Sequence, residues 1–210
     1  MEAQAIAARI QSAYGACSSY RNKGVVSWSS RSGHPREVNF ETYFVRPDCF
    51  RFDWIRRHPY PALAEVRHQF SIFRKGESAR FRWERDSTAG GRIVDDKQMA
   101  SLEMAVAAGV GTSGEAAVWI HQLLFPESCQ PRAILLNRVS ELLPHTQPFG
   151  PLDCYVLRGN ADPLGNIEFW ADTAQFAVRK SLIRNGSLTR EINITESVFD
   201  EAIEAARFDN

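Results

Sequence analysis

The chain has 210 residues, with 25 basic and 25 acidic side chains, so its formal net charge is zero. A chain of this length can bury a core that needs no disulfide or metal, and we expect one domain spanning residues 1–210. Because the net charge is zero, the chain lacks the electrostatic attraction typical of proteins that bind duplex nucleic acid or anionic membranes.

The N-terminal segment is predicted to form an amphipathic helix. Ile6, Ile10, Tyr14 and Cys17 recur at helical spacing on one face. The segment lacks the basic start, apolar run and cleavage site of a secretory signal, and no stretch of the chain is apolar enough to cross a bilayer. The protein is therefore expected to be cytoplasmic unless a leader has been removed, in which case it is expected to be periplasmic or exported.

From Tyr20 onward the apolar period changes to two, which sends alternate side chains to opposite faces of a strand. The segment Phe50-Arg-Phe-Asp-Trp54 shows this alternation. In this half the sequence predicts strands over residues 20–30, 37–45, 49–56, 69–74 and 79–84.

The middle of the chain, residues 97–125, has apolar residues at every third or fourth position and predicts two short helices broken at residues 109–114. Strands are then predicted over residues 133–142, 154–159, 167–172, 176–184 and 187–194. Asn185-Gly186 predicts a type I′ hairpin turn between the last two. A final helix is expected from about Ser197 to Phe208.

These elements predict an α+β fold, in which a curled antiparallel sheet forms an unclosed β-barrel (half-barrel) and helices cover its concave face. The expected inner face is rich in large apolar side chains. They could line a cavity for an apolar ligand or form an ordinary core, and both interpretations stay open. The residues concerned, with those of the helices that would cover them, are Trp28, Phe40, Phe44, Phe50, Phe52, Trp54, Phe81, Trp83, Val118, Trp119, Leu123, Leu124 and Phe169.

The segment Gly109-Val-Gly-Thr-Ser-Gly114 matches the dinucleotide fingerprint G-x-G-x-x-G. That fingerprint binds pyrophosphate only where it follows a strand and opens a crossover helix. Here it follows a helix, so we interpret it as a glycine that ends one helix and a Ser113 that caps the next. No cofactor is expected, and no G-x-S-x-G elbow marks a catalytic nucleophile.

Cysteine and histidine spacing gives no metal site. Cys17, Cys49, Cys129 and Cys154 are far apart, form no C-x-x-C pair, and the histidines do not cluster. Two disulfides remain open, but four free thiols that pack as small hydrophobes are the simpler interpretation.

Arginine and aromatic residues alternate in Arg80-Phe-Arg-Trp83. A platform for single-stranded nucleic acid needs cations and aromatic rings on one face. Alternation places them on opposite faces of a strand, so no nucleic acid is expected as a partner.

Two segments carry a family resemblance: Phe40-Glu-Thr-Tyr-Phe-Val-Arg-Pro-Asp-Cys-Phe-Arg-Phe52, with its Arg-Pro-Asp turn, and Glu168-Phe-Trp-Ala-Asp-Thr-Ala-Gln-Phe-Ala-Val-Arg-Lys180. With these segments, the order of elements from about residue 5 to 195 resembles the LolA/LolB-like superfamily. This superfamily contains the bacterial carriers that sort outer-membrane lipoproteins, together with uncharacterised relatives.

The resemblance implies a half-barrel with an apolar cavity for acyl chains and a helical lid, which is residues 98–124 here. It implies non-enzymatic binding of a lipid or lipidated protein in the periplasm, with no cofactor and with a peripheral encounter with a membrane. Two alternatives stay open: a protein-interaction module with a filled core, and an enzyme whose site is assembled from loops.

Overall fold

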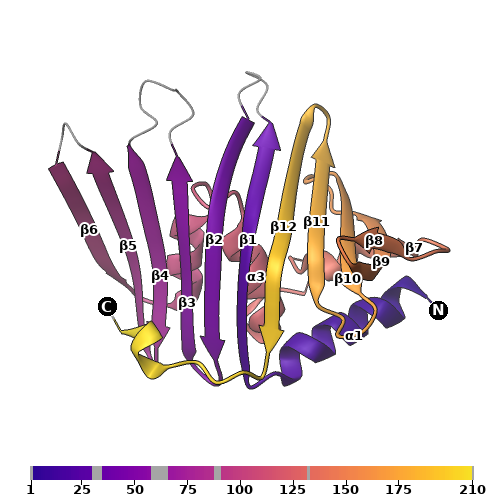
Figure 1. Ribbon diagram of the computed structural model, residues 1–210, viewed down its shortest axis with the longest axis horizontal. Helices are drawn as coiled ribbons and strands as arrows, with labels where there is room; N and C mark the ends of the chain where they lie inside the picture. Colours follow the sequence, from indigo (N-terminus) through magenta and orange to yellow (C-terminus); the bar gives the residue numbers. More distant parts are fainter. Residues whose placement is uncertain (1, 30–34, 58–65, 88–90, 132, 210) are drawn as a thin grey trace.

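The computed structural model of the protein describes residues 2–29, 35–57, 66–87, 91–131 and 133–209. Twelve strands form one antiparallel sheet (Figure 1). They are β1 (Ser19–Ser29), β2 (Pro35–Val45), β3 (Cys49–Arg57), β4 (Arg67–Lys75), β5 (Ser78–Ser87), β6 (Gly91–Met99), β7 (Val139–Leu142), β8 (Gln147–Phe149), β9 (Leu152–Asn160), β10 (Asn166–Asp172), β11 (Val178–Asn185) and β12 (Leu188–Phe199). Their order is β6-β5-β4-β3-β2-β1-β12-β11-β10-β9-β7, with β8 paired to β9. Because β6 and β7 end this order without pairing to each other, the sheet is an unclosed half-barrel.

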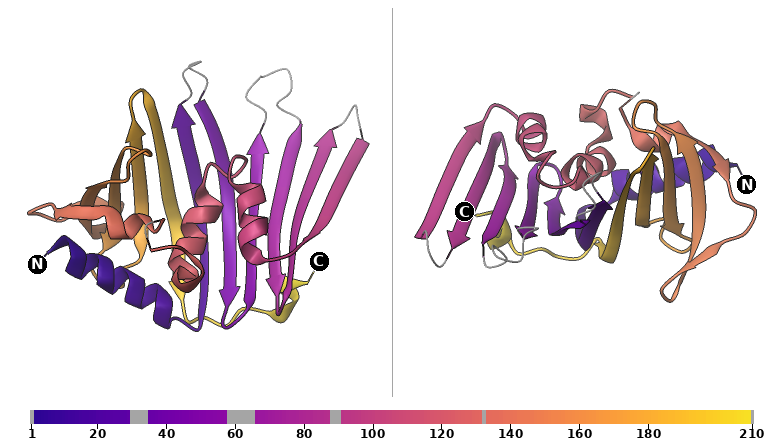
Figure 2. Two further views of the ribbon diagram at one scale, coloured as in Figure 1. Left: turned by 180° about the vertical axis from the view of Figure 1, so that it is seen from behind. Right: turned by 90° about the horizontal axis from the view of Figure 1, so that it is seen from above.

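Helices α1 (Ala3–Ala16), α2 (Leu102–Gly109) and α3 (Ala116–Leu124) cover one face of this sheet. Figure 2 shows α2 and α3 side by side over its middle, with α1 along its lower edge. The predicted α+β class, with helices over the concave face of a curled antiparallel sheet, is thereby confirmed. Within the described part of the chain, no helix is long and apolar enough to span a membrane.

The side chains that face the helices form rungs across neighbouring strands. In one rung, Phe40, Trp54, Phe70 and Trp83 lie side by side on β2, β3, β4 and β5. Trp54 stacks on Phe70 with 5.1 Å between the ring centroids. The next two rungs consist of Thr42, Phe52, Ile72 and Phe81, and of Phe44, Phe50, Arg74 and Ala79. The period-two pattern of the sequence therefore gives a largely apolar inner face.

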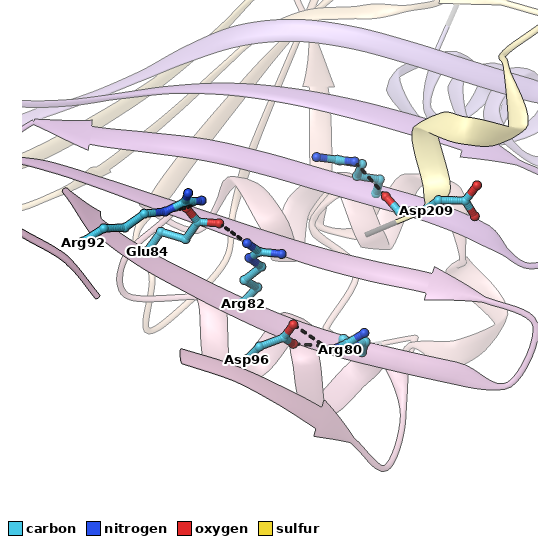
Figure 3. A network of polar contacts seen from close by, with 7 residues as sticks. Arg80, Arg82, Glu84, Arg92, Asp96 and Asp209 are labelled. Atoms are coloured by element: carbon cyan, nitrogen blue, oxygen red, sulfur yellow. Dashed lines mark hydrogen bonds and ion pairs between the residues drawn. The ribbon is translucent and has the colours of Figure 1, made fainter. Parts of the chain in front are cut away.

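The opposite face of the same strands is charged. Arg80 of β5 pairs with Asp96 of β6 at 2.6 Å, and Glu84 accepts from both Arg82 at 2.6 Å and Arg92 at 2.5 Å (Figure 3). The aromatic residues that alternate with these arginines face the helices. Arg80 and Arg82 thus lie on the opposite face from Phe81 and Trp83, as the alternation predicts.

Strand β6 is not predicted from the sequence, and residues 97–99 are strand, not helix as expected. It is an edge strand, hydrogen-bonded to β5 alone. Ile93 and Val94, which point to opposite sides, are each 46% exposed. An edge strand with solvent on both faces needs no apolar alternation, and its charges discourage further pairing.

The predicted C-terminal helix is wrong. Ser197 is paired in β12 opposite Asn22, and only residues Ala205–Phe208 form a short 3-10 helix. Asp200 ends the strand with a φ of 59°, and its carboxylate accepts from the backbone N–H of Ser18 at 2.7 Å. Alternation inside β12 and spaced alanines beyond it together resemble one amphipathic helix, which explains the error.

Two smaller predictions also need correction. The two-residue loop between β11 and β12 is Gly186-Ser187, because Asn185 pairs with Leu188. Positive φ occurs at Gly186 and not at Asn185, so the hairpin is confirmed but the type I′ turn over Asn185-Gly186 is not. Residues 133–142 form strand only at β7, after a 3-10 helix at Leu135–Arg138.

Candidate functional site

The thirteen side chains predicted to line the concave side lie in the hydrophobic core or pack against it. Nine of them have exposed fractions of 4% or less: Phe40, Phe44, Phe50, Phe52, Trp54, Trp119, Leu123, Leu124 and Phe169. The other four, Trp28, Phe81, Trp83 and Val118, are only partly buried. Most of the inner face is therefore packed by the helices, and an apolar ligand would first reach these four side chains.

The helices approach the sheet closely because glycines lie at the contact. A Cβ atom on Gly109 would lie 2.9 Å from the Trp54 ring, and one on Gly114 would lie 2.9 Å from the Trp28 ring. Gly114 also has a φ of 62°, which favours glycine. These glycines serve helix–sheet packing, and they join two helices instead of a strand and a helix.

The predicted caps need correction: the C-cap residue of α2 is Val110 and not a glycine, and the N-cap residue of α3 is Glu115 and not Ser113. The Ser113 Oγ nevertheless accepts from the N–H of Ala117 at 3.4 Å, near the start of α3. Further along α3, the Trp119 ring stacks on Phe169 of β10 with 6.2 Å between the centroids. Through this contact, helix α3 packs against the second half of the sheet.

Polar contacts hold both ends of α3. At its start, Glu115 adopts a φ of 70°, unusual for a non-glycine residue, and forms an ion pair with Arg190 of β12. At its end, Arg46 donates to the carbonyl oxygen of Leu124 at 3.4 Å and to that of Tyr14 at 3.0 Å. Arg46 therefore joins the last turns of α1 and α3 to the end of β2.

Helix α2 is attached differently. Ser101 caps its start, and the Ser101 Oγ accepts from the Met104 N–H at 3.3 Å. Within the described residues, no hydrogen bond or ion pair joins an α2 side chain to the sheet, and Leu102, Ala105 and Val106 make apolar contacts. Met104 is 53% exposed. The attachment of α2 thus depends mainly on apolar packing, with a charge interaction between Glu103 of α2 and Arg74 of β4 in addition.

The apolar inner face becomes basic toward one end of the strands. Beyond the rung of Phe40 and Trp54, the inward positions are Val38 and Arg56, and beyond these Arg36 follows on β2. We call Arg36 and Arg56 the basic rim. Neither arginine was predicted as a site residue, although the signal was available: both occupy inward positions of the alternation, where an apolar residue is expected.

A histidine and a cysteine meet beside α3. The Cys129 Sγ lies 3.6 Å from His121 Nδ1, and the Ser128 Oγ lies 3.2 Å from His121 Nε2. Burial raises the pKa of the Cys129 thiol and lowers that of the His121 imidazole. Both groups are therefore held neutral, whereas a nucleophilic cysteine needs a thiolate. No group of three or more potential metal ligands occurs among the described residues.

All four cysteines are free thiols, which agrees with the simpler of the two interpretations. Burial raises the pKa of Cys17 and Cys154 to about 11. A thiol in the unfolded chain titrates at about pH 8.5, so the unfolded chain loses these protons first as the pH rises. The two protonated thiols therefore contribute fully to the free energy of unfolding below about pH 8.5. This contribution is lost as the pH rises from there to about pH 11.

We expect the thermal unfolding midpoint to fall as the pH is raised from 8 to 10.5. The matched variants are Cys17→Ala/Cys154→Ala and Cys49→Ala/Cys129→Ala, each compared with the unchanged protein by circular dichroism. The first pair should flatten the alkaline decline more than the second, whose thiols are more exposed. Equal slopes for the two pairs would contradict the assignment.

Solved structures of other proteins are similar to this chain. No family model and no curated protein matches the chain. Among solved structures, LprF from Mycobacterium bovis matches with a TM-score of 0.56 and 13% identity, over 99% of this chain and 96% of that one. The lipoprotein LppX from Mycobacterium tuberculosis matches with a TM-score of 0.51 and 12% identity, over 96% and 97%. The Pseudomonas aeruginosa MucA/MucB complex matches with a TM-score of 0.51 and 13% identity, over 99% and 60%.

The chain shares its fold with LprF and LppX. The unclosed half-barrel with covering helices that the sequence resemblance implies is thereby confirmed. At identities of 12–13%, these matches show a common fold and not a shared ligand.

Proposed function

We propose that the protein binds the acyl chain of a lipid or lipidated protein, without catalysis, between the concave face of the sheet and the α2–α3 pair. The observation that carries this proposal is the aromatic inner face, whose rungs are covered by helices through apolar contacts. Affinity would come from apolar area, at roughly 25 cal/mol per Å² before the cost of ordering.

Residues 98–124 act as the lid in this proposal, and α2 is the part that moves. Among the described residues, no hydrogen bond or ion pair joins its side chains to the sheet, whereas α3 has such contacts at both ends. Displacement of α2 would uncover Trp54 and Ile72, which Gly109 now contacts. The partly buried Phe81 and Trp83 would then form the entry side of the cavity.

The test is native mass spectrometry of the purified protein, followed by organic extraction and lipid analysis, together with titration of a fluorescent fatty-acid probe. We expect a co-purified acyl species or stoichiometric uptake of the probe. Phe81→Gln should weaken probe binding roughly tenfold, because an apolar wall residue is lost. Arg82→Gln, one residue along on the outer face, should change it less than about twofold. A clean apo mass with no probe uptake would overturn the proposal.

The proposed partner is an apolar ligand or a lipidated protein. The protein would collect this ligand during a peripheral encounter with a membrane. Exchange of such cargo fits an exported, periplasmic location. A reporter fusion that detects export would test the location separately from ligand binding, provided that it carries the complete coding sequence.

A protein-interaction module with a filled core is the second candidate. The nine sealed side chains favour it, because they leave little of the inner face free in this conformation. The Pseudomonas aeruginosa MucA/MucB structure is a complex of two proteins, and its similarity to this chain shows that the fold occurs in a protein–protein assembly. A groove on the outer face, lined by Lys23, Asn39, Asp53 and Gln69, offers a surface for such contact. This candidate predicts no probe uptake by the wild-type protein.

A further inference from the structure

On β2 and β3 the inner face changes from apolar to basic within two rungs. Phe40 and Trp54 are 2% and 1% exposed. One rung further, Val38 lies opposite Arg56, and Arg36 lies two residues before Val38 on the same face. Arg36 and Arg56 are therefore diagonal neighbours, about 7–8 Å apart at their Cα atoms. Figure 2 shows these strand ends extending beyond α2 and α3.

The basic rim has no described counter-charge. Within the described part of the chain, neither Arg36 nor Arg56 forms an ion pair or side-chain hydrogen bond. By contrast, Arg190, across β1 from Arg36, is paired with Glu115, and the outer-face residues Arg80 and Arg82 have carboxylate partners. Both rim side chains are half-buried. Burial and the charge of Arg36 lower the pKa of Arg56, so its surroundings disfavour the charged form of the Arg56 guanidinium.

The surroundings of the rim fit the junction of an amphiphile. Trp28 lies directly opposite Arg36, and Trp54 lies two residues before Arg56 on the same face. The Trp54 Nε1 and the Arg190 Nε are buried donors without a partner among the described residues. An anionic group attached to a hydrocarbon chain would accept hydrogen bonds from these donors, while its chain packs against the apolar side chains of the inner face.

We propose that Arg36 and Arg56 bind the anionic headgroup of an amphiphile, a carboxylate or phosphate, while its acyl chain lies against the aromatic rungs below. The inference rests on the proposed function, because it assigns the class of ligand to that same face. Because neither guanidinium group has an ion-pair partner among the described residues, each can donate to the headgroup oxygens without breaking an ion pair described there.

The test compares two probes with the same chain, 11-(dansylamino)undecanoic acid and its methyl ester. The wild-type protein should bind the acid roughly tenfold or more tightly than the ester, because only the acid is charged. Arg36→Gln/Arg56→Gln should abolish this preference, because it should weaken acid binding much more than ester binding. Arg36→Lys/Arg56→Lys should restore most of it. Arg67→Gln/Arg80→Gln removes the same charge from the outer face and should preserve the preference.

The outcomes separate the two proposals. If the acid and the ester bind equally well, the acyl-binding proposal stands and the basic rim is overturned as a headgroup site. If neither probe binds, the acyl-binding proposal fails, and this inference fails with it. Inorganic phosphate at millimolar concentration should not displace the acid; displacement would overturn the assignment to a headgroup in favour of a free anion. Thermal midpoints of all variants near or above the wild-type value confirm that folding is retained.

Discussion

Arg179→Met is expected to lower the free energy of unfolding by about 3–5 kcal/mol, because it leaves a buried carboxylate without its cation. The Arg179 Nη2 and Nε lie 2.8 Å and 2.9 Å from Asp172 Oδ2, with the two side chains 11% and 4% exposed. The other oxygen, Oδ1, accepts from the Gln175 N–H at 2.6 Å. The pair thus fixes the connection between β10 and β11. Urea unfolding monitored by circular dichroism measures the effect.

Two controls make this expectation specific. Asp172→Leu/Arg179→Met removes both charges and should cost less than the single Arg179→Met, because no unpaired charge stays buried. Arg80→Met, at the surface pair with Asp96, should change stability by less than about 1 kcal/mol. If Arg80→Met and Arg179→Met have equal effects, the buried pair does not have the role assigned to it.

Trp54→Ala is expected to cost about 3–5 kcal/mol, the range for removal of a fully packed aromatic side chain. Trp54 is 1% exposed, stacks on Phe70 at 5.1 Å, and contacts Gly109 of α2. Its Nε1 has no described partner. Trp54→Phe should therefore cost less than about 1.5 kcal/mol, since it keeps most of the ring volume and removes an unsatisfied donor.

The same pair of variants bears on the choice between a cavity and a filled core. If α2 packs against a filled core, Trp54→Ala should lower the free energy of unfolding much more than Trp54→Phe does. Thermal or urea unfolding measures this difference. A cost for Trp54→Ala of under about 1 kcal/mol would mean that the ring has little packing to lose. The description of Trp54 as sealed core would then be wrong.

The sequence predicted the local architecture well because local periodicity encodes it. In Phe50-Arg-Phe-Asp-Trp54, alternation alone assigns the three aromatic residues to the inner face, and the structure places them there. The two helices around residues 109–114 follow from helical spacing interrupted by glycines. Errors occur where the pattern is weak, as in the solvated edge strand β6, or ambiguous, as after Ser197.

The candidate site was predictable only in part. The sequence selected thirteen apolar residues but could not separate the sealed ones, such as Phe52, from the reachable ones, such as Trp83. It also gave no reason to connect Arg36 with Arg56. Their proximity depends on the register of β2 against β3, in which Val38 pairs with Arg56.

By itself, the sequence determined which face of each strand is apolar, where most turns fall, and that the chain forms a curled antiparallel sheet with covering helices. These features depend on side chains a few positions apart. The tertiary structure alone decided that β1 pairs with β12, Tyr20 opposite Phe199, and that the two halves of the sheet therefore join. It also decided which apolar side chains the helices bury, and which arginines lie on neighbouring strands without a counter-charge among the described residues. These outcomes depend on contacts between distant residues, which are set by the joint burial of whole surfaces and leave no periodic trace in the chain.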